Sequence, residues 1–95
     1  MTIVVTVRYH NLFRRAAGSE KERLCLASGS SIHDALEQLT GGSDGALQSL
    51  LFTAERDVVA YLVVFRNQRL VTHDQFDTQL VDGDELQLFP AVAGG

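Results

Sequence analysis

The chain has 95 residues, of which 45% are hydrophobic and 21% are charged, and a formal net charge of −4, as in one ordinary globular domain. This charge argues against a nucleic-acid partner, because such binding depends on Lys and Arg side chains that neutralise phosphates. No apolar run approaches the roughly 20 residues of a membrane span, and the opening MTIVVTVRYH lacks the basic start of a signal peptide; we therefore expect no membrane partner and a cytoplasmic location.

The first 27 residues predict two strands that form a hairpin. The stretch IVVTVRY has the two-residue period of a half-buried strand, with these residues on one face: Ile3, Val5, Val7 and Tyr9. NLFRRAAG is interpreted as a loop that closes at Gly18, and KERLCLA as a second strand with Leu24 and Leu26 on one face. The single cysteine, Cys25, is interpreted as a strand residue rather than a reactive thiol, and it agrees with a reducing compartment.

A helix is predicted after Ser31, which is a suitable N-cap. Asp34 follows three residues later, as the acid of a capping box does. The apolar residues follow the helical period: Ile32, Ala35, Leu36 and Leu39. Gly41 and Gly42 are expected to end this helix, and a shorter amphipathic helix is expected over residues 46–54.

The C-terminal half predicts three more strands. AYLVVFR is apolar on both faces and is interpreted as the middle strand of the sheet. A turn at 67–69 leads to a short strand at 70–72, and HDQFDTQL is irregular with room for one helical turn. Asp82-Gly83-Asp84 is a tight turn before the last strand, ELQLF, in which Leu86 and Leu88 face the core.

The order of these elements predicts an α+β roll, a mixed sheet packed on one main helix. The first and last strands can lie side by side in its centre, which is the arrangement of the ubiquitin-like β-grasp fold. We expect residues 1–90 to form this domain and residues 91–95 to form a flexible Gly-Gly tail that projects from a central strand.

The charges are unevenly distributed along the chain. Residues 1–27 hold five basic and two acidic side chains, whereas residues 28–95 hold three and ten. Acidic residues gather in the sequence before the tail: Asp74, Asp77, Asp82, Asp84 and Glu85. Two interpretations stay open, since these carboxylates can steer the tail toward a basic partner or can simply form turns and a solvated face.

Motifs for catalysis or metal binding are not found in the sequence. His10, His33 and His73 lack the short spacings of zinc ligands, and DGDE lacks the further ligands of a calcium loop. The chain contains no phosphate-binding G-x-x-x-x-G-K-S/T, no G-x-G-x-x-G and no G-x-S-x-G. We therefore predict a protein that is not an enzyme and binds no cofactor or metal.

The C-terminal end FPAVAGG is the most unusual segment. Pro90 cannot donate a ladder hydrogen bond, so we expect strand pairing to weaken there. Gly94 and Gly95 have no Cβ and can pass through a channel too narrow for other residues, which would bring the terminal carboxylate to a distant active site. A frayed chain end is the alternative interpretation.

Three stretches, VRYHNLFRRAAGSEKERLCL, NQRLV and LVDGDELQLFPAVAGG, together resemble the MoaD/ThiS family of ubiquitin-like sulfur carriers. They lie closest to the small subunit of molybdopterin synthase, and the resemblance covers nearly the whole chain. Its most specific part is the D-G-D-E turn, the apolar strand, Phe-Pro and V-x-G-G at the chain end.

The resemblance implies that a ubiquitin-activating-like adenylyltransferase uses ATP to adenylate Gly95, and that a persulfide converts the product to a thiocarboxylate. Gly95 would carry the sulfur, and Gly94 would give slim passage. The implied recipient is cyclic pyranopterin monophosphate on the large subunit of molybdopterin synthase, although thiamine synthesis, tRNA thiolation and cysteine synthesis stay open as pathways. A ubiquitin-like protein modifier is the second hypothesis, and the only lysine available for chain building is Lys21.

The resemblance also implies an apolar docking patch at His10, Leu70 and Phe89, continued by Pro90 and Val92 of the C-terminal segment. By alternation Phe89 points away from the core, and exposed aromatic residues are typical interface anchors; covering a neighbouring strand is the alternative. This chain departs from the family at His10, where an aromatic hydrocarbon ring is expected, and at Ala91, which replaces a second proline.

Overall fold

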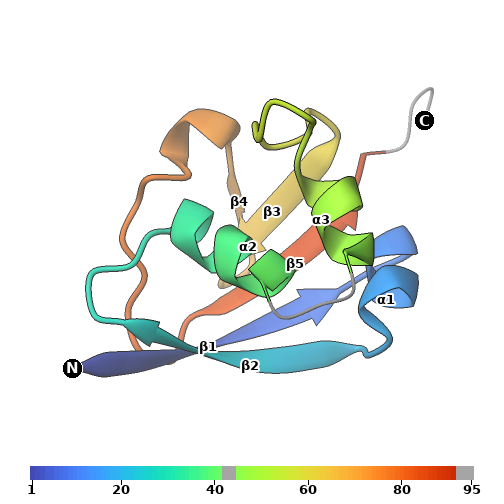
Figure 1. Ribbon diagram of the computed structural model, residues 1–95. Helices are drawn as coiled ribbons and strands as arrows, with labels where there is room; N and C mark the ends of the chain where they lie inside the picture. The colour runs from blue at the N-terminus through green and yellow to red at the C-terminus, as the bar shows by residue number, and fades with distance from the viewer. Residues whose placement is uncertain (42–44, 92–95) are drawn as a thin grey trace.

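A computed structural model describes residues 1–41 and 45–91, which form a mixed sheet with helices on one face (Figure 1). The strand order is β2-β1-β5-β3-β4. In chain order the elements are β1 (Thr2–Tyr9), α1 (Leu12–Ala17), β2 (Lys21–Ala27), α2 (Ile32–Gly41), α3 (Ala46–Leu51), β3 (Leu62–Arg66), β4 (Arg69–Val71), the 3₁₀ turn η1 (His73–Gln75) and β5 (Glu85–Pro90). The predicted α+β roll is confirmed.

The first and last strands do lie side by side, as predicted. β1 runs parallel to β5, with Thr6 opposite Glu85 and Tyr9 opposite Leu88, and antiparallel to β2. The prediction that residues 60–66 form the middle strand is wrong, because β5 occupies that place and β3 lies between β5 and the edge strand β4. Both faces of β3 are apolar for another reason: one packs on the helices, and the other stays half exposed at Val63 and Phe65.

Helix α1 occupies the stretch that was interpreted as a loop. Phe13 is fully buried, and Gly18 ends the helix in the left-handed conformation with φ 74°, its N–H donating to the carbonyl oxygen of Arg14 at 3.0 Å. One buried aromatic residue in a six-residue helix gives too short a pattern for the helical period to be recognised.

The other two helices follow the predicted pattern more closely. Asp34 N–H donates to Ser31 Oγ at 3.1 Å, and Ser31 N–H donates to Asp34 Oδ2 at 2.9 Å, which confirms the capping box of α2. Gly42 lies outside the described residues. α3 ends at Leu51, three residues earlier than predicted, because Phe52 is extended and forms a bridge with Val58.

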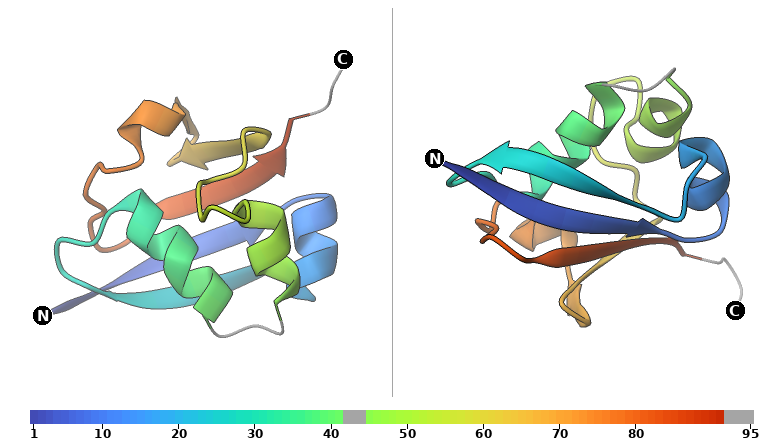
Figure 2. Two further views of the ribbon diagram at one scale, coloured as in Figure 1. Left: turned by 45° about the horizontal axis from the view of Figure 1, so that its top comes forward. Right: turned by 90° about the horizontal axis from the view of Figure 1, so that it is seen from below.

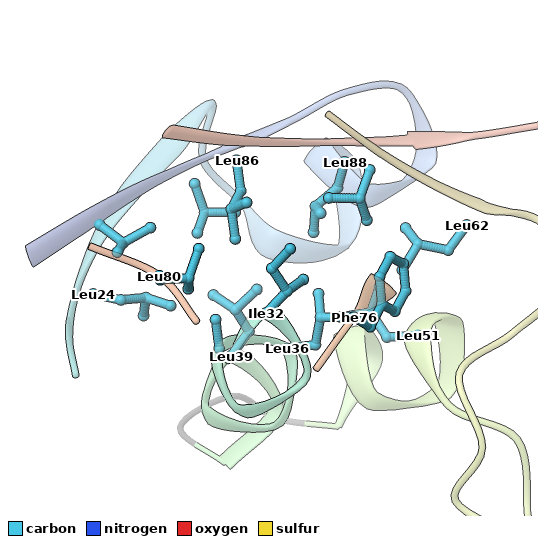
Figure 3. Close-up of a cluster of buried hydrophobic side chains, with 14 of the residues drawn as sticks. Leu24, Ile32, Leu36, Leu39, Leu51, Leu62, Phe76, Leu80, Leu86 and Leu88 are labelled. Atoms are coloured by element: carbon cyan, nitrogen blue, oxygen red, sulfur yellow. The ribbon is translucent and has the colours of Figure 1, made fainter. Parts of the chain in front are cut away.

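The core fills the space between the sheet and the helices. Figure 3 shows leucines of β5 pointing toward α2, whose four predicted apolar residues are all buried. Phe76 and Leu80, from the segment between η1 and β5, also belong to this core. None of the helices in the described part of the chain is long and apolar enough to cross a membrane.

Two tight turns determine where β4 and β5 begin. Asn67 and Gln68 form a two-residue hairpin turn with φ of 50° and 71°, so β4 begins at Arg69, one residue earlier than predicted. Gly83 has φ 90° in the predicted turn before β5, where positive φ favours glycine.

Candidate functional site

Strand β5 carries the chain to one end of the sheet, opposite the N-terminus (Figures 1 and 2). Pairing with β3 continues through Pro90, which lies opposite Leu62, and Ala91 N–H donates to the carbonyl oxygen of Tyr61 at 2.7 Å. The tail predicted to start at Ala91 therefore begins with a residue that is still bonded to the sheet. Three predicted site residues, Val92, Gly94 and Gly95, lie outside the described residues, and the flexibility of the tail stays a prediction.

An aromatic cluster lies beside this end of β5 on the sheet face away from the helices; we define it as His10, Phe65 and Phe89. The rings of His10 and Phe89 stack with centroids 4.0 Å apart and planes 5° apart. Phe65 meets Phe89 edge to face with centroids 5.6 Å apart. A side-chain contact of 3.0 Å between His10 Nε2 and Gln87 Oε1 fixes the imidazole further. His10 thus provides the planar ring that the resemblance led us to expect from an aromatic hydrocarbon.

Three of the predicted docking residues, His10, Leu70 and Phe89, lie on this face. Leu70 lies opposite Phe65 across the β3–β4 hairpin and is 58% exposed. Pro90 is half-buried at the end of β5. A shallow hollow of about 240 Å³ lies between the residues Phe65, Gln68, Gln87 and Phe89. The structure therefore joins His10, Leu70 and Phe89 on one face of the sheet, whereas Pro90 lies opposite the buried Leu62 and so belongs to the other face. The role of these residues in binding stays a prediction.

Phe65 also belongs to this surface, although it was not among the residues predicted from the sequence. The signal was present, because Phe65 alternates with the buried residues Leu62 and Val64 and therefore faces the opposite side. Interpreting the strand as covered on both faces hid that signal.

The acidic D-G-D-E turn holds the start of β5 in place. Asp82 Oδ1 accepts a hydrogen bond from Val4 N–H at 2.7 Å, and Glu85 pairs with Arg8 at 2.9 Å. Asp84 is only 4% exposed and accepts hydrogen bonds from Val81 N–H at 2.8 Å, from Asn67 at 2.8 Å and from Arg66 at 3.0 Å.

These contacts change the acidity of Asp84. Burial by itself would raise the pKa of this carboxyl group, but the hydrogen bonds from Val81 N–H, Asn67 and Arg66, together with the Arg66 charge, leave the pKa below its usual value. Asp84 is therefore a charged, fully bonded hub between the β3–β4 hairpin and β5.

The position of these acids decides between the two interpretations of the acidic stretch. Asp82, Asp84 and Glu85 lie at the start of β5, and the C-terminal segment leaves from its other end, six residues later. At about 3.3 Å per residue, the two ends are roughly 17 Å apart. The three carboxylates form their hydrogen bonds and ion pairs within the domain, which agrees with their interpretation as structural residues of the turn. Although they are near the C-terminal residues in the sequence, the length of β5 separates them from Pro90 in the structure.

The histidines lie in three separate settings. His73 Nε2 lies 2.7 Å from the carbonyl oxygen of Leu62. His33, Asp34 and Glu37 bring three possible ligand atoms within 4.8 Å of one another at the start of α2, a group that the spacing of histidines alone did not indicate. Asp34 is already engaged in the capping box, and the group lies at the surface, far from the end of β5.

Comparison with known proteins identifies the family. The model of the ThiS family matches residues 7–95. The chain belongs to the ThiS family. This ThiS-family chain is 32% identical over 90 residues to small archaeal modifier protein 3 of Haloferax volcanii, covering 94% of this chain and 96% of that protein.

Two solved structures agree with this family and with the β-grasp fold. The crystal structure of SAMP1 from Haloferax volcanii has a TM-score of 0.85 at 28% identity and covers 97% of this chain and 99% of that chain. A candidate molybdopterin converting factor, subunit 1, from Pyrococcus furiosus has a TM-score of 0.74 at 27% identity, with 95% and 99% covered. The ThiS-family chain is thus a small ubiquitin-like protein of the sulfur-carrier and modifier group.

Proposed function

We propose that the chain is a sulfur carrier whose Gly95 carboxylate is converted to a thiocarboxylate, with molybdopterin synthesis as its pathway. The observation that carries this proposal is that the central strand β5 ends at Pro90, next to the half-buried ring of Phe89, and that the Gly-Gly end follows four residues later in the sequence. Family membership and the likeness to a candidate molybdopterin converting factor subunit support it.

The chemistry requires an activating enzyme and a sulfur donor. The Gly95 carboxylate attacks the α-phosphate of ATP on an adenylyltransferase, which forms the acyl adenylate and releases pyrophosphate. A persulfide attacks the acyl carbon and displaces AMP, and a thiol then cleaves the resulting acyl disulfide to leave the thiocarboxylate. The domain described here docks and aims the tail, while ATP and the catalytic groups belong to the partner. The acceptor is the large subunit of molybdopterin synthase in this proposal.

Intact-mass spectrometry tests this function. After incubation with a ubiquitin-activating-like adenylyltransferase, ATP and a persulfide donor, we expect a mass increase equal to the exchange of one oxygen for one sulfur. The matched control omits ATP, without which the carboxylate stays unactivated. An unchanged mass with several such enzymes would contradict the proposal.

Protein modification is the second candidate function, favoured by the names of the modifier proteins that the chain resembles. Both functions begin with the same acyl adenylate, but a modifier transfers its acyl group to the amine of a lysine. Lys21 is exposed on β2 and is the only lysine available for chains of the protein itself. Conjugates on denaturing gels that disappear when Gly95 is deleted would establish this second function.

Replacing Phe89 tests the docking surface. We expect Phe89→Ala to weaken binding to the adenylyltransferase by about 10- to 100-fold, as removal of an aromatic anchor does. The free energy of unfolding should fall by only about 1–2 kcal/mol, because the half-buried ring loses two aromatic contacts. Calorimetry measures the first quantity and urea unfolding the second.

Val81→Ala is the matched control for this experiment, since Val81 is 57% exposed and lies just before the start of β5, away from the aromatic cluster. It should leave binding unchanged. Equal affinities for the wild type and Phe89→Ala would remove Phe89 from the interface.

A further inference from the structure

The surface on the α1 side of the exit of the C-terminal segment is basic. Arg14 and Arg15 line an open hollow of about 690 Å³ together with Asn11, Gly18, Ser19 and Glu20. Both arginines are exposed, and among the described residues neither has an ion-pair partner. We call these two residues the basic rim.

The contacts of α1 place the helix that carries the basic rim beside the end of β5. Phe13, which precedes Arg14, faces the ring of Tyr61 with centroids 6.3 Å apart, and the carbonyl oxygen of Tyr61 accepts the Ala91 N–H. On the other side of the exit His10, just before α1, stacks on Phe89. Figures 1 and 2 show α1 and the end of β5 at the same end of the sheet in every view.

The acidic side chains near the basic rim neutralise only part of its positive charge. Glu20 shares its hollow, whereas Glu22 accepts a hydrogen bond from the Tyr9 hydroxyl at 2.6 Å. The acids Asp82, Asp84 and Glu85 are bonded at the opposite end of β5. The end of β5 at Ala91 thus lies at the same end of the sheet as the helix that carries Arg14 and Arg15, whereas the acidic residues that precede it in the sequence lie at the other end (Figure 1).

We propose that the basic rim receives carboxylate side chains of the protein that accepts the C-terminal segment; this rests on the proposed function and deepens it. Guanidinium groups bind carboxylates in a bidentate geometry, and exposed charges at the edge of an interface act mainly on the association rate and on its salt dependence. The partner therefore presents Asp or Glu side chains at the entrance of the channel that the tail enters.

The length of the C-terminal segment favours carboxylates of the partner protein, rather than the phosphates of ATP, as the groups that bind the basic rim. Four residues follow Ala91 in the sequence, and a chain of this length spans at most about 14 Å when fully extended. With Gly95 at the reacting phosphate, the basic rim stays at the entrance of the partner's site. It meets the partner's surface there, and ATP lies beyond it.

A short acidic peptide tests the rim without any enzyme. In an NMR titration of the full chain with hexaglutamate at low salt, we expect the Nε–H signals of Arg14 and Arg15 and the amide signals of Gly18 and Ser19 to shift. Arg14→Glu/Arg15→Glu should abolish the shifts at Gly18 and Ser19. Equal shifts at Arg23 and Arg69, which are also exposed, would show unspecific attraction and overturn the proposal.

Kinetics with the adenylyltransferase test the rim in its function. We expect Arg14→Glu/Arg15→Glu to lower kcat/KM for adenylation about tenfold at low ionic strength through KM, with kcat unchanged, and about 1 M salt should remove the difference. Arg23→Glu/Arg69→Glu makes the same change in charge elsewhere and should have little effect. If α1 only uses these arginines to complement its negative C-terminal end, the melting temperature will fall while KM stays unchanged.

The two proposals fail in different ways. No adenylation of the wild-type chain would contradict the proposed function, and the peptide titration would still decide whether the rim binds carboxylates. Adenylation of the wild type with equal KM for both double variants would overturn the basic rim alone.

Discussion

Removing Gly94 and Gly95 is expected to abolish adenylation and sulfur transfer while the melting temperature changes by no more than about 2 °C. Activity should be lost because the proposed reaction takes place on the terminal carboxylate, which the shortened chain presents two residues too early. Stability should persist because the last main-chain hydrogen bond of the described domain is made by Ala91. Intact-mass spectrometry after activation and a thermal melt measure the two effects.

Gly95→Ala is the matched control for this deletion. It keeps the length of the chain and the carboxylate and adds a single methyl group. It therefore tests whether the partner's channel admits a side chain, separately from whether the chain is long enough to reach the active site. We expect adenylation to be slower than in the wild type but still detectable. Full sulfur transfer by the deletion variant, or a melting temperature lower by many degrees, would contradict this interpretation of the tail.

Replacing Asp84 by Ala should destabilise the domain by about 3 kcal/mol, the largest effect on folding that we expect from an acidic residue of this chain. The substitution leaves the Arg66 guanidinium and the Val81 N–H without the carboxylate that they contact at 2.8 Å. It also removes one contact of the β3–β4 turn, because Asn67 loses its bond to Asp84 and keeps only its hydrogen bonds with the Glu85 main chain. Urea unfolding measures the change in the free energy of unfolding.

Asp77→Ala is the matched control, since Asp77 is an exposed acid in the segment that leads to β5. Its unfolding free energy should stay within about 0.5 kcal/mol of the wild type. Equal stability of Asp84→Ala and Asp77→Ala would show that the hub contributes nothing.

The Asp84 contribution should also depend on pH. The pKa of Asp84 is lower in the folded chain than its usual value, which is about 3.9 in an unfolded chain. Its stabilisation is therefore fully present above the unfolded pKa and is lost as the pH falls through the folded pKa. The difference in unfolding free energy between the wild type and Asp84→Asn should accordingly shrink on acidification below about pH 4.

Local chemistry made much of the fold predictable. The capping box at Ser31 and Asp34, the turn at Gly83 and the alternation of Leu86 and Leu88 each act over a few residues, and each is found as predicted. Helix α1 was missed because a single buried residue, Phe13, gives no period to recognise.

What the sequence left open depends on tertiary placement. Phe65 belongs to the aromatic cluster only because β5 places Phe89 against it. Arg14 and Arg15 lie at the same end of the sheet as the end of β5 only because α1 folds beside Tyr61 (Figure 1). The acids of the D-G-D-E turn precede the C-terminal residues in sequence, but β5 separates this turn from Pro90 by the length of the strand. Closeness in the sequence was therefore a poor guide to which charged side chains lie near the candidate site.

Locating the transferred sulfur by tandem mass spectrometry tests the central claim most directly. The exposed Cys25 thiol on β2 is the other group of this chain that could take up sulfur. After incubation with the adenylyltransferase, ATP and a persulfide donor, we expect the exchange of oxygen for sulfur in the C-terminal fragment that contains Gly95, with the Cys25 peptide unchanged. Sulfur added at Cys25, with an unmodified C-terminal fragment, would contradict the account.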